Sequence, residues 1–268
     1  MPTKIEFQQG PDAYRGRAII EPLYPGYGTT LGNALRRVLL SSLPGAAVTA
    51  VKIQNAPHEF TTLPKVQEDV LQIVLNLKQL RVQLLGDENQ AKLKLNVKGE
   101  RQVVAGDIEP DSQVRIINPD LVIATLTSRN AELEMDIWID SGRGYVPTEA
   151  REKEKMEIGA IAIDALYSPV RQVTFNVEPA RVGQMTNYDK LVLDILTDGT
   201  ITPAKAIAAS GQLIIDHLAL ITEQLTWLSV EQISKETPSK TVDKLETNTA
   251  DAEKIKKKRG RKPKTSNE

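Results

Sequence analysis

The sequence predicts an α+β fold that ends in a disordered basic tail, and three observations lead to this prediction. Strand and helix patterns alternate near the N-terminus, short strands with alternating apolar residues fill the middle, and a long apolar helix precedes the tail. The chain has 268 residues and is 40% hydrophobic, which is adequate for a substantial core. We therefore expect a folded body over residues 1–228 and a tail over residues 229–268.

The first predicted elements are a strand over residues 17–24 and a helix within EPLYPGYGTTLGNALRRVLLSSLPG, residues 21–45. Turn residues such as Pro25-Gly26 separate the two, and Thr29 or Thr30 is expected to cap the helix. Pro44-Gly45 is expected to end it. Arg36 and Arg37 project about 100° apart around the helix axis, so both cannot share its apolar stripe. At least one arginine should be free to meet a partner.

The middle of the chain predicts one further helix among several strands. The helix is expected over residues 66–80, where apolar residues recur at helical spacing. Strands are expected over residues 48–54, 92–98, 114–117, 121–126, 132–139 and 171–178. Gly142-Arg-Gly144 should end the strand-rich part, and the charged residues 148–157 should form a surface loop.

The last predicted element is a helix of about 25 residues, with Thr202 as its N-cap and Pro203 at its first position. Gly211 inside it costs about 1 kcal/mol relative to Ala, which indicates either close packing or a tolerated weakness. The apolar face of this helix is wider than one neighbour requires. An ordinary core and a subunit interface both fit that pattern.

Composition argues against catalysis by this chain. There is no cysteine, and His58 and His217 are the only histidines, so thiol chemistry and Cys-ligated or His-rich metal sites are excluded. Asp136 and Asp140 share one side of a strand but lack a third ligand, and PGYGTTL lacks the lysine of a phosphate-binding loop. We expect no catalytic residue, metal or cofactor. The sequence shows no signal peptide and no apolar run near the about 18 residues of a membrane span, which predicts a cytoplasmic protein.

Several blocks of sequence, in order, carry a resemblance to a known family. They are NALRR at residues 33–37, HEF at 58–60, VQEDVLQIVLNLKQL at 66–80, GRGYVP at 142–147, SPVRQVTFNVEPARV at 168–182 and DKLVLDILTDGTITPAKAI at 189–207. Together they resemble the N-terminal assembly domain of the bacterial-type RNA polymerase α subunit, over about residues 1–228. The resemblance implies a homodimeric scaffold that nucleates assembly of the β and β′ subunits and meets the σ factor and ω subunit only through the holoenzyme.

The same resemblance implies a domain division and a set of contact residues. A split α/β dimerisation domain is expected at residues 1–44 and 168–228, with an inserted β-rich domain at residues 45–167. Implied β contacts are Arg37, Leu40, His58, Glu59 and Phe60, and implied β′ contacts are Lys78, Asp164 and Val170. The implied dimer surface comprises Tyr27, Leu31, Leu35, Ile214, Leu218, Ile221 and Leu225.

The tail departs from the family pattern, which typically continues into a helical DNA-binding domain that this chain is expected to lack. Residues 229–268 hold 11 Lys+Arg against 7 Asp+Glu, a net +4, while the rest of the chain carries −5. The segment KIKKKRGRKPK, residues 254–264, resembles an AT-hook. Its Arg259, Gly260, Arg261 and Lys262 would enter the narrow minor groove of A·T-rich DNA. A generic polycation that binds any nucleic acid is the alternative.

Two other functions are weighed against the assembly scaffold. A stand-alone DNA-binding architectural protein would explain the tail but leave residues 1–228 without a purpose. A metabolic enzyme of unrecognised class would require a catalytic constellation, and no such motif is present in the sequence. The scaffold hypothesis explains all of the blocks, and as part of a polymerase it predicts association with the nucleoid.

Overall fold

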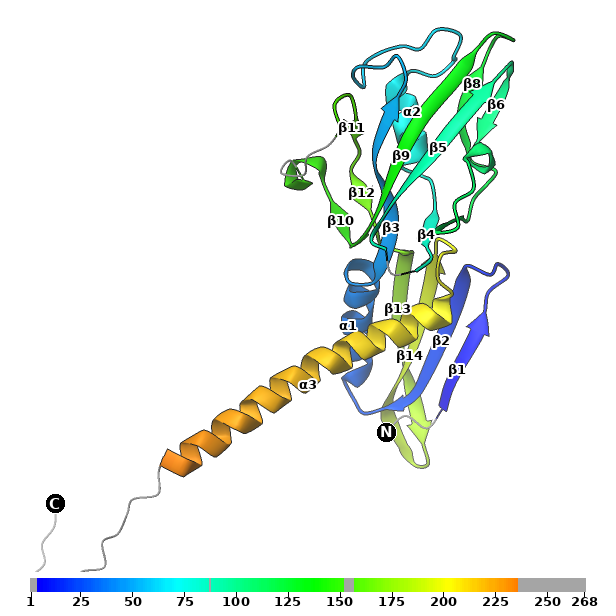
Figure 1. Cartoon of the computed structure of the whole chain (residues 1–268). Helices are drawn as coiled ribbons and strands as arrows, with labels where there is room; N and C mark the ends of the chain where they lie inside the picture. The colour runs from blue at the N-terminus through cyan, green and yellow to red at the C-terminus, as the bar shows by residue number, and fades with distance from the viewer. Residues whose placement is uncertain (1–3, 87, 152–156, 236–268) are drawn as a thin grey trace, which may run out of the picture. The chain divides into compact units, whose positions relative to one another are not determined.

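The computed structural model describes residues 4–86, 88–151 and 157–235, with only the backbone for residues 226–235. The described residues fall into two units, residues 4–220 and residues 221–235, and the second is helical. The first unit contains a four-stranded sheet, a six-stranded sheet and two small two-stranded sheets. The predicted α+β class is confirmed (Figure 1).

The four-stranded sheet is antiparallel, with the order β1-β2-β14-β13. Its strands are β1 (Lys4–Gln9), β2 (Arg15–Leu23), β13 (Val170–Val182) and β14 (Met185–Thr197). The register pairs Ala18 with Leu193 on a buried face, and Arg17 with Asp194 on the opposite face, where Nε and Oδ1 lie 2.7 Å apart. The sheet therefore has one apolar and one charged face.

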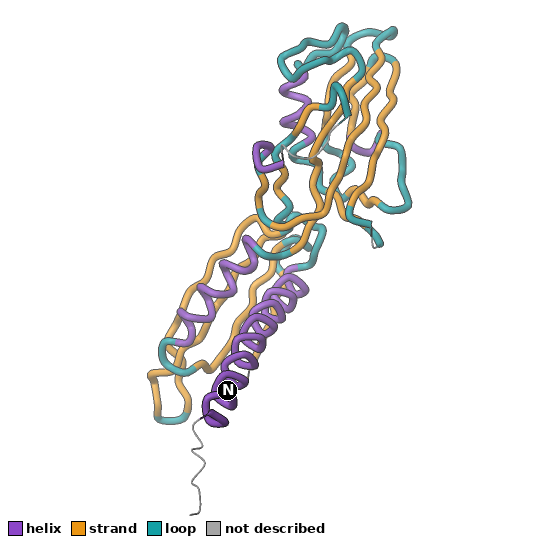
Figure 2. Tube along the Cα trace, turned by 60° about the vertical axis from the view of Figure 1, so that its left-hand side comes forward, coloured by secondary structure: helices purple, strands orange, loops and turns teal. Residues whose placement is uncertain are grey.

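Two helices cover the apolar face of this sheet. They are α1 (Tyr27–Ser41) and the first part of α3 (Pro203–Lys235), which lie alongside the same strands in both views (Figures 1 and 2). Leu39 of α1 and Ala206 of α3 are fully buried in one core with Leu193 of β14. Two segments that are far apart in the sequence thus pack on the same face of one sheet.

The start of α1 differs from the prediction, because neither Thr29 nor Thr30 caps it. The N-cap is Gly26, with a φ of 85° and no capping side chain. Instead, Oδ2 of Asp189 on β14 accepts hydrogen bonds from the backbone N–H groups of Gly26 at 2.8 Å and Gly28 at 3.0 Å. A carboxylate is well suited to this position because the N-terminus of a helix carries partial positive charge. The cap comes from a strand 163 residues away in sequence.

The six-stranded sheet follows α1 directly. Pro44-Gly45 is predicted to end the helix; α1 ends at Ser41, and Pro44 begins β3, four residues before the predicted start of the strand at residue 48. The order is β5-β9-β3-β4-β7, with β11 paired to β3. The strands are β3 (Pro44–Ile53), β4 (Val82–Leu84), β5 (Gln90–Lys98), β7 (Val114–Ile116), β9 (Glu132–Arg143) and β11 (Ile161–Ala162). β9 continues four residues past its predicted end at residue 139 and ends at Arg143, within the Gly-Arg-Gly segment.

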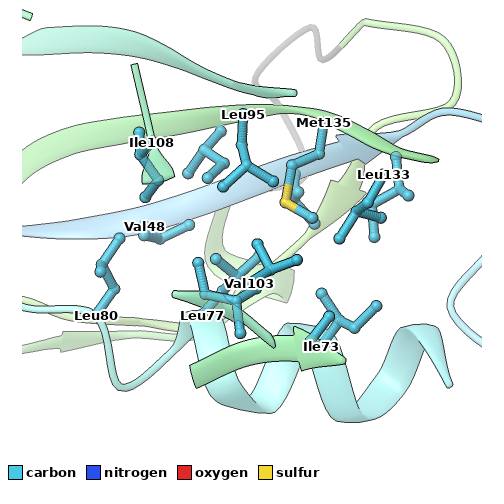
Figure 3. Close-up of a cluster of buried hydrophobic side chains, with 14 of the residues drawn as sticks. Val48, Ile73, Leu77, Leu80, Leu95, Val103, Ile108, Leu133 and Met135 are labelled. Atoms are coloured by element: carbon cyan, nitrogen blue, oxygen red, sulfur yellow. The ribbon is translucent and has the colours of Figure 1, made fainter. Parts of the chain in front are cut away.

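A large core fills the space between this sheet and the elements that cover it. These are α2 (Val70–Leu77) and the two-stranded sheet of β6 (Arg101–Val104) and β8 (Val122–Leu126). Ile73 and Leu77 of α2 point toward Leu95 and Met135 of the large sheet, and all four are at most 1% exposed (Figure 3). The core of this part is therefore closed within one chain.

α2 is shorter than the predicted helix over residues 66–80. Asp69 is its N-cap and accepts a 2.7 Å hydrogen bond from the backbone N–H of Gln72, which fixes the start at Val70. Val66 instead forms an isolated bridge with Leu126. Val66 therefore continues the apolar pattern of α2 in the sequence, but it contacts β8 and is not part of the helix.

The predicted surface loop over residues 148–157 is only partly described, since residues 152–156 lie outside the described residues. Its beginning is the 3-10 helix Thr148–Arg151, called η2. Arg151 is only 7% exposed, and its guanidinium donates to the backbone carbonyl groups of Ile163 and Thr49. A charged residue of this segment is thus part of the interior. Next to it, β10 (Tyr145–Val146) pairs with β12 (Ala165–Leu166).

α3 begins as predicted and continues further than predicted. The backbone N–H of Lys205 donates to Oγ1 of Thr202 at 3.4 Å, and Pro203 is the first helical residue. The helix has 33 residues and reaches Lys235, seven residues into the predicted tail. The remainder of the predicted tail, including the AT-hook-like segment, lies outside the described residues.

The apolar character of α3 needs an explanation. Among the described residues, one helical stretch, Pro203–Leu225, is long and apolar enough to cross a membrane, yet only 11% of its apolar window is buried. The sequence-based statement that no such stretch exists is therefore wrong. No atom in the described part of the chain lies within 4 Å of a Cβ built at Gly211, so this glycine is not required for packing within the protomer.

Candidate subunit-assembly surfaces

The outward side of α1 carries the two arginines singled out in the sequence. The inward side is fixed tightly: a Cβ on Gly32 would lie 2.6 Å from Cδ2 of Phe175, so only glycine lets the helix approach β13 this closely. Leu40 is half-buried against the same core. Arg36 and Arg37 are both exposed, and neither guanidinium has an ion pair or hydrogen bond within the described ranges. A rigid helix therefore presents two cations.

The loop between β3 and α2 carries the predicted residues His58, Glu59 and Phe60. Nδ1 of His58 lies 3.1 Å from Oγ1 of Thr61, and Phe60 is 75% exposed. Near its end the loop is held by Glu68, whose carboxylate accepts from the backbone N–H of Thr125 at 2.6 Å. The loop thus presents an aromatic side chain of the kind that anchors protein interfaces. No hydrogen bond or ion pair among the described residues joins it to Arg37.

Two of the three predicted β′ contacts lie together. Nζ of Lys78, just after α2, is 3.1 Å from Oδ2 of Asp164, whose Oδ1 accepts a 3.1 Å hydrogen bond from the backbone N–H of Thr148. The Thr148 N–H and then Lys78 hold the pKa of Asp164 below its usual value. Tyr145 joins the cluster, with its ring centroid 5.9 Å from Nζ of Lys78. Val170 is different: it is 4% exposed and belongs to the core under α1, so its side chain does not reach the surface.

The residues predicted for the dimer surface fall into three classes of exposure. Leu35 is 9% exposed and packs in its own protomer's core, while Leu31 and Ile214 are half-buried. Tyr27 and Leu218 are 56% and 57% exposed. In the second unit, Ile221 and Leu225 are 55% and 60% exposed. Within α3, the spacing of residues 214, 218, 221 and 225 is that of one helical stripe.

Two residues escaped the sequence reasoning. Tyr145 lies inside the GRGYVP block, so its position next to Lys78 could have been suspected from that motif. Asp189 opens the DKLVLDILTDG block, but no local pattern shows that it caps α1. Tyr188, beside it, packs against Tyr24 with ring centroids 5.9 Å apart, and Tyr24 packs on Tyr27 at 6.2 Å. This aromatic group flanks the start of α1.

The chemistry that these surfaces offer is recognition. Within the described ranges no group of three or more His, Asp or Glu side chains is placed to hold a metal ion. Asp136, one of the paired carboxylates noted in the sequence, has its Oδ2 3.1 Å from Nζ of Lys92. Exposed arginines, an exposed aromatic ring and an exposed apolar helix stripe are features of protein interfaces.

Comparison with known proteins places this architecture in a class. Residues 51–168 match the family model described as the RNA polymerase Rpb3/RpoA insert domain. The chain thus has the plan of an RNA polymerase subunit that contains this insert domain. It is also 47% identical over 240 residues to the DNA-directed RNA polymerase subunit alpha of Carboxydothermus hydrogenoformans, an alignment that spans 88% of this chain and 75% of that protein. The chain belongs to the bacterial DNA-directed RNA polymerase α-subunit family.

Proposed function

We propose that the chain is a homodimeric scaffold on which the β and β′ subunits of RNA polymerase assemble. The observation that carries this proposal is the exposed apolar stripe of α3, represented by Leu225 at 60% exposure. Burying one such side chain contributes about 1.5–3 kcal/mol, so several of them on two facing helices would support a stable dimer. A second copy of the chain offers the same stripe, as an isologous interface requires.

Recruitment of β is proposed to use Arg37 together with the loop that carries Phe60. Support comes from the exposure of both side chains and from the absence of a competing carboxylate on Arg37 within the described ranges. The planar guanidinium can make several directional hydrogen bonds to one partner group. Recruitment of β′ is proposed to use the surface of Lys78, Tyr145 and Asp164, with Val170 supporting β13 from beneath.

Within this proposal the chain is part of a nucleotidyltransferase but carries none of its catalytic residues. Nucleotidyl transfer would take place in the large subunits, and the σ factor and ω subunit would be reached through the assembled enzyme. The protein would act in the cytoplasm, at the nucleoid.

The test is co-expression of the full chain with β and β′, followed by purification through a tag on the α chain. Arg37→Ala should lose most of the captured β. The dimer should persist, because the Arg37 guanidinium makes no ion pair or hydrogen bond within the described ranges. Arg36→Ala is the matched control, because Arg36 is the neighbouring residue and is also exposed. Leu225→Asp should give monomers in analytical ultracentrifugation. Normal capture of β by Arg37→Ala, with an intact dimer, would show that the proposed β surface is wrong.

Direct contact of the tail with A·T-rich DNA is proposed from the sequence alone. The alternative function, a stand-alone DNA-binding architectural protein, would predict a dimer that purifies without large subunits. Binding of A·T-rich and G·C-rich duplexes should be compared between the full chain and a version ending at Lys235, the last residue of α3. A preference for A·T that disappears with the tail is expected. An equal loss on both duplexes would indicate a generic polycation instead.

A further inference from the structure

Two arginines outside the set of predicted contact residues lie beside members of that set in sequence. The first, Arg171, follows Val170 at a bulge in β13: Val170 pairs with Thr197 and Gln172 with Leu196, so Arg171 is the extra residue. A bulge redirects a side chain relative to the regular alternation of the strand. Arg171 is exposed and has no ion pair or hydrogen bond within the described ranges.

The second, Arg81, lies between α2 and β4, three residues after Lys78. Its Nη1 donates to the backbone carbonyl oxygen of Asp198 at 2.8 Å, and its own backbone N–H donates to Oδ1 of Asn118 at 2.8 Å. Asp198 directly follows Thr197, the partner of Val170, so both arginines converge on the same end of the β13–β14 pair. Nε of Arg81 is buried without a hydrogen-bond partner among the described groups.

The charge at this corner is not balanced. The carboxylate of Asp198 acts on Arg171, but its Oδ1 already accepts from the backbone N–H of Thr200 at 2.9 Å and from the Thr200 Oγ1 hydroxyl at 2.6 Å. Partial burial and then the positive charge of Arg81 lower the pKa of Arg171, in agreement with the convergence of both residues on one end of the β13–β14 pair. Two neighbouring cations that are partly withdrawn from water are costly unless an anion approaches them.

We propose that Arg81 and Arg171 form a receptor for a carboxylate side chain of the large subunit that binds at Lys78 and Asp164. This inference rests on the proposed β′ surface and extends it. Continuity supports the choice of partner, since Lys78 precedes Arg81 by three residues and Val170 directly precedes Arg171. Guanidinium groups bind carboxylates with two parallel hydrogen bonds, which gives the contact a fixed geometry. Such a contact would set the orientation of β′ on the scaffold.

The experiment measures the Kd of the purified full-length α dimer for β′. The variants are Arg171→Gln, Arg81→Gln and the double variant, with the exposed Arg129→Gln as a matched control. Each single variant should weaken β′ binding by about 10-fold or more, because truncating one side of a partly buried charged contact leaves the other side unpaired. The double variant should lose less binding free energy for β′ than the sum of the two single losses, since the two side chains bind one carboxylate. Dimerisation and capture of β should stay unchanged.

Further arms separate the possible failures. Arg81→Gln removes a hydrogen bond to Asp198 and could disturb folding, whereas Arg171 is exposed, so Arg171→Gln alone must show the effect and Arg171→Lys should restore part of it. Unchanged β′ binding in the folded double variant, with a loss in Lys78→Glu, would overturn the receptor and leave the proposed function standing. Unchanged binding in Lys78→Glu as well would refute the proposed β′ surface itself. Loss of binding to a DNA duplex with β′ binding intact would also overturn the receptor, by identifying the anion as phosphate.

Discussion

The two large sheets of the first unit differ in how completely one chain buries them. Under the six-stranded sheet, the side chains of Ile73, Leu77, Leu95 and Met135 are at most 1% exposed. Over the four-stranded sheet, the apolar face continues into side chains that stay in water, such as Phe7 at 40% and Ile5 at 71% exposure. The first region is a finished core, whereas the second has apolar surface left over for a partner.

The difference follows from what each sheet has to cover it. The six-stranded sheet is covered by α2 together with the separate β6–β8 sheet, and their side chains fill one continuous cluster. The four-stranded sheet has α1 and α3, and its core cluster is smaller and bordered by half-buried residues such as Leu213 and Ile214. An apolar side chain that is buried in its own core cannot at the same time be exposed on a surface that binds a partner. The six-stranded sheet has a closed core, and the four-stranded sheet keeps apolar side chains exposed.

The most direct test of this difference in burial is to replace one leucine by alanine in each of the two regions. Leu95→Ala should cost about 2–5 kcal/mol of unfolding free energy, because a fully buried leucine leaves a cavity. Leu218→Ala should cost the protomer well under about 1 kcal/mol, because its side chain is already 57% exposed. Denaturant unfolding of both variants in a Leu225→Asp or dilute monomeric background measures this. Similar losses in the two regions would mean that α3 is already covered within one chain.

The closed region was the easier one to predict from sequence. Alternation in KLKLNVK located β5 to within two residues, because a strand with one buried face repeats every second position. Val66 shows the limit: its apolar spacing continued that of α2, but Asp69 starts the helix later and Val66 pairs with Leu126 instead. Periodicity identifies which residues are buried and cannot say which neighbour buries them.

The candidate contact residues show a second limit. The family resemblance named Lys78 and Asp164, and the structure brings their charged atoms to 3.1 Å. It also named Val170, which points into the core. Asp189 and Arg81 needed the fold, since each forms a hydrogen bond with a group that is distant in sequence. Whether these residues contact β, β′ or a second α chain stays a prediction.

A smaller effect is expected at the junction of α1 with the open sheet. Asp189→Ala should destabilise the protomer by about 1–2 kcal/mol, because it leaves the N–H groups of Gly26 and Gly28 without an acceptor at the helix N-terminus. The dimer should weaken as well, since the first turn of α1 carries Tyr27. Thermal unfolding and sedimentation at several protein concentrations give the two numbers.

The matched control for Asp189 is Asp194→Ala on the same strand. Asp194 pairs with Arg17 on the charged face, where both side chains are about half exposed, and such pairs contribute about 0–1 kcal/mol. If Asp194→Ala weakened the dimer as much as Asp189→Ala, the effect would come from the strand in general. The capping role of Asp189 would then be wrong.

The smallest expected effect concerns the polar surface of the closed region and its dependence on pH. The pKa of Asp164 is lower in the folded protein than its ordinary value of about 3.9, so the ionised carboxylate stabilises the fold above that value and this contribution is lost as pH falls through the lower folded pKa. Asp164→Asn should therefore be less stable than the parent chain at pH 6, and the gap should narrow below about pH 4. The Thr148 N–H is the largest single cause of the shift, so Lys78→Gln should keep part of this pH dependence. If Lys78→Gln abolished it, the ion pair would dominate, and Lys78 would be less available to a partner than the exposed Arg37 of the open region.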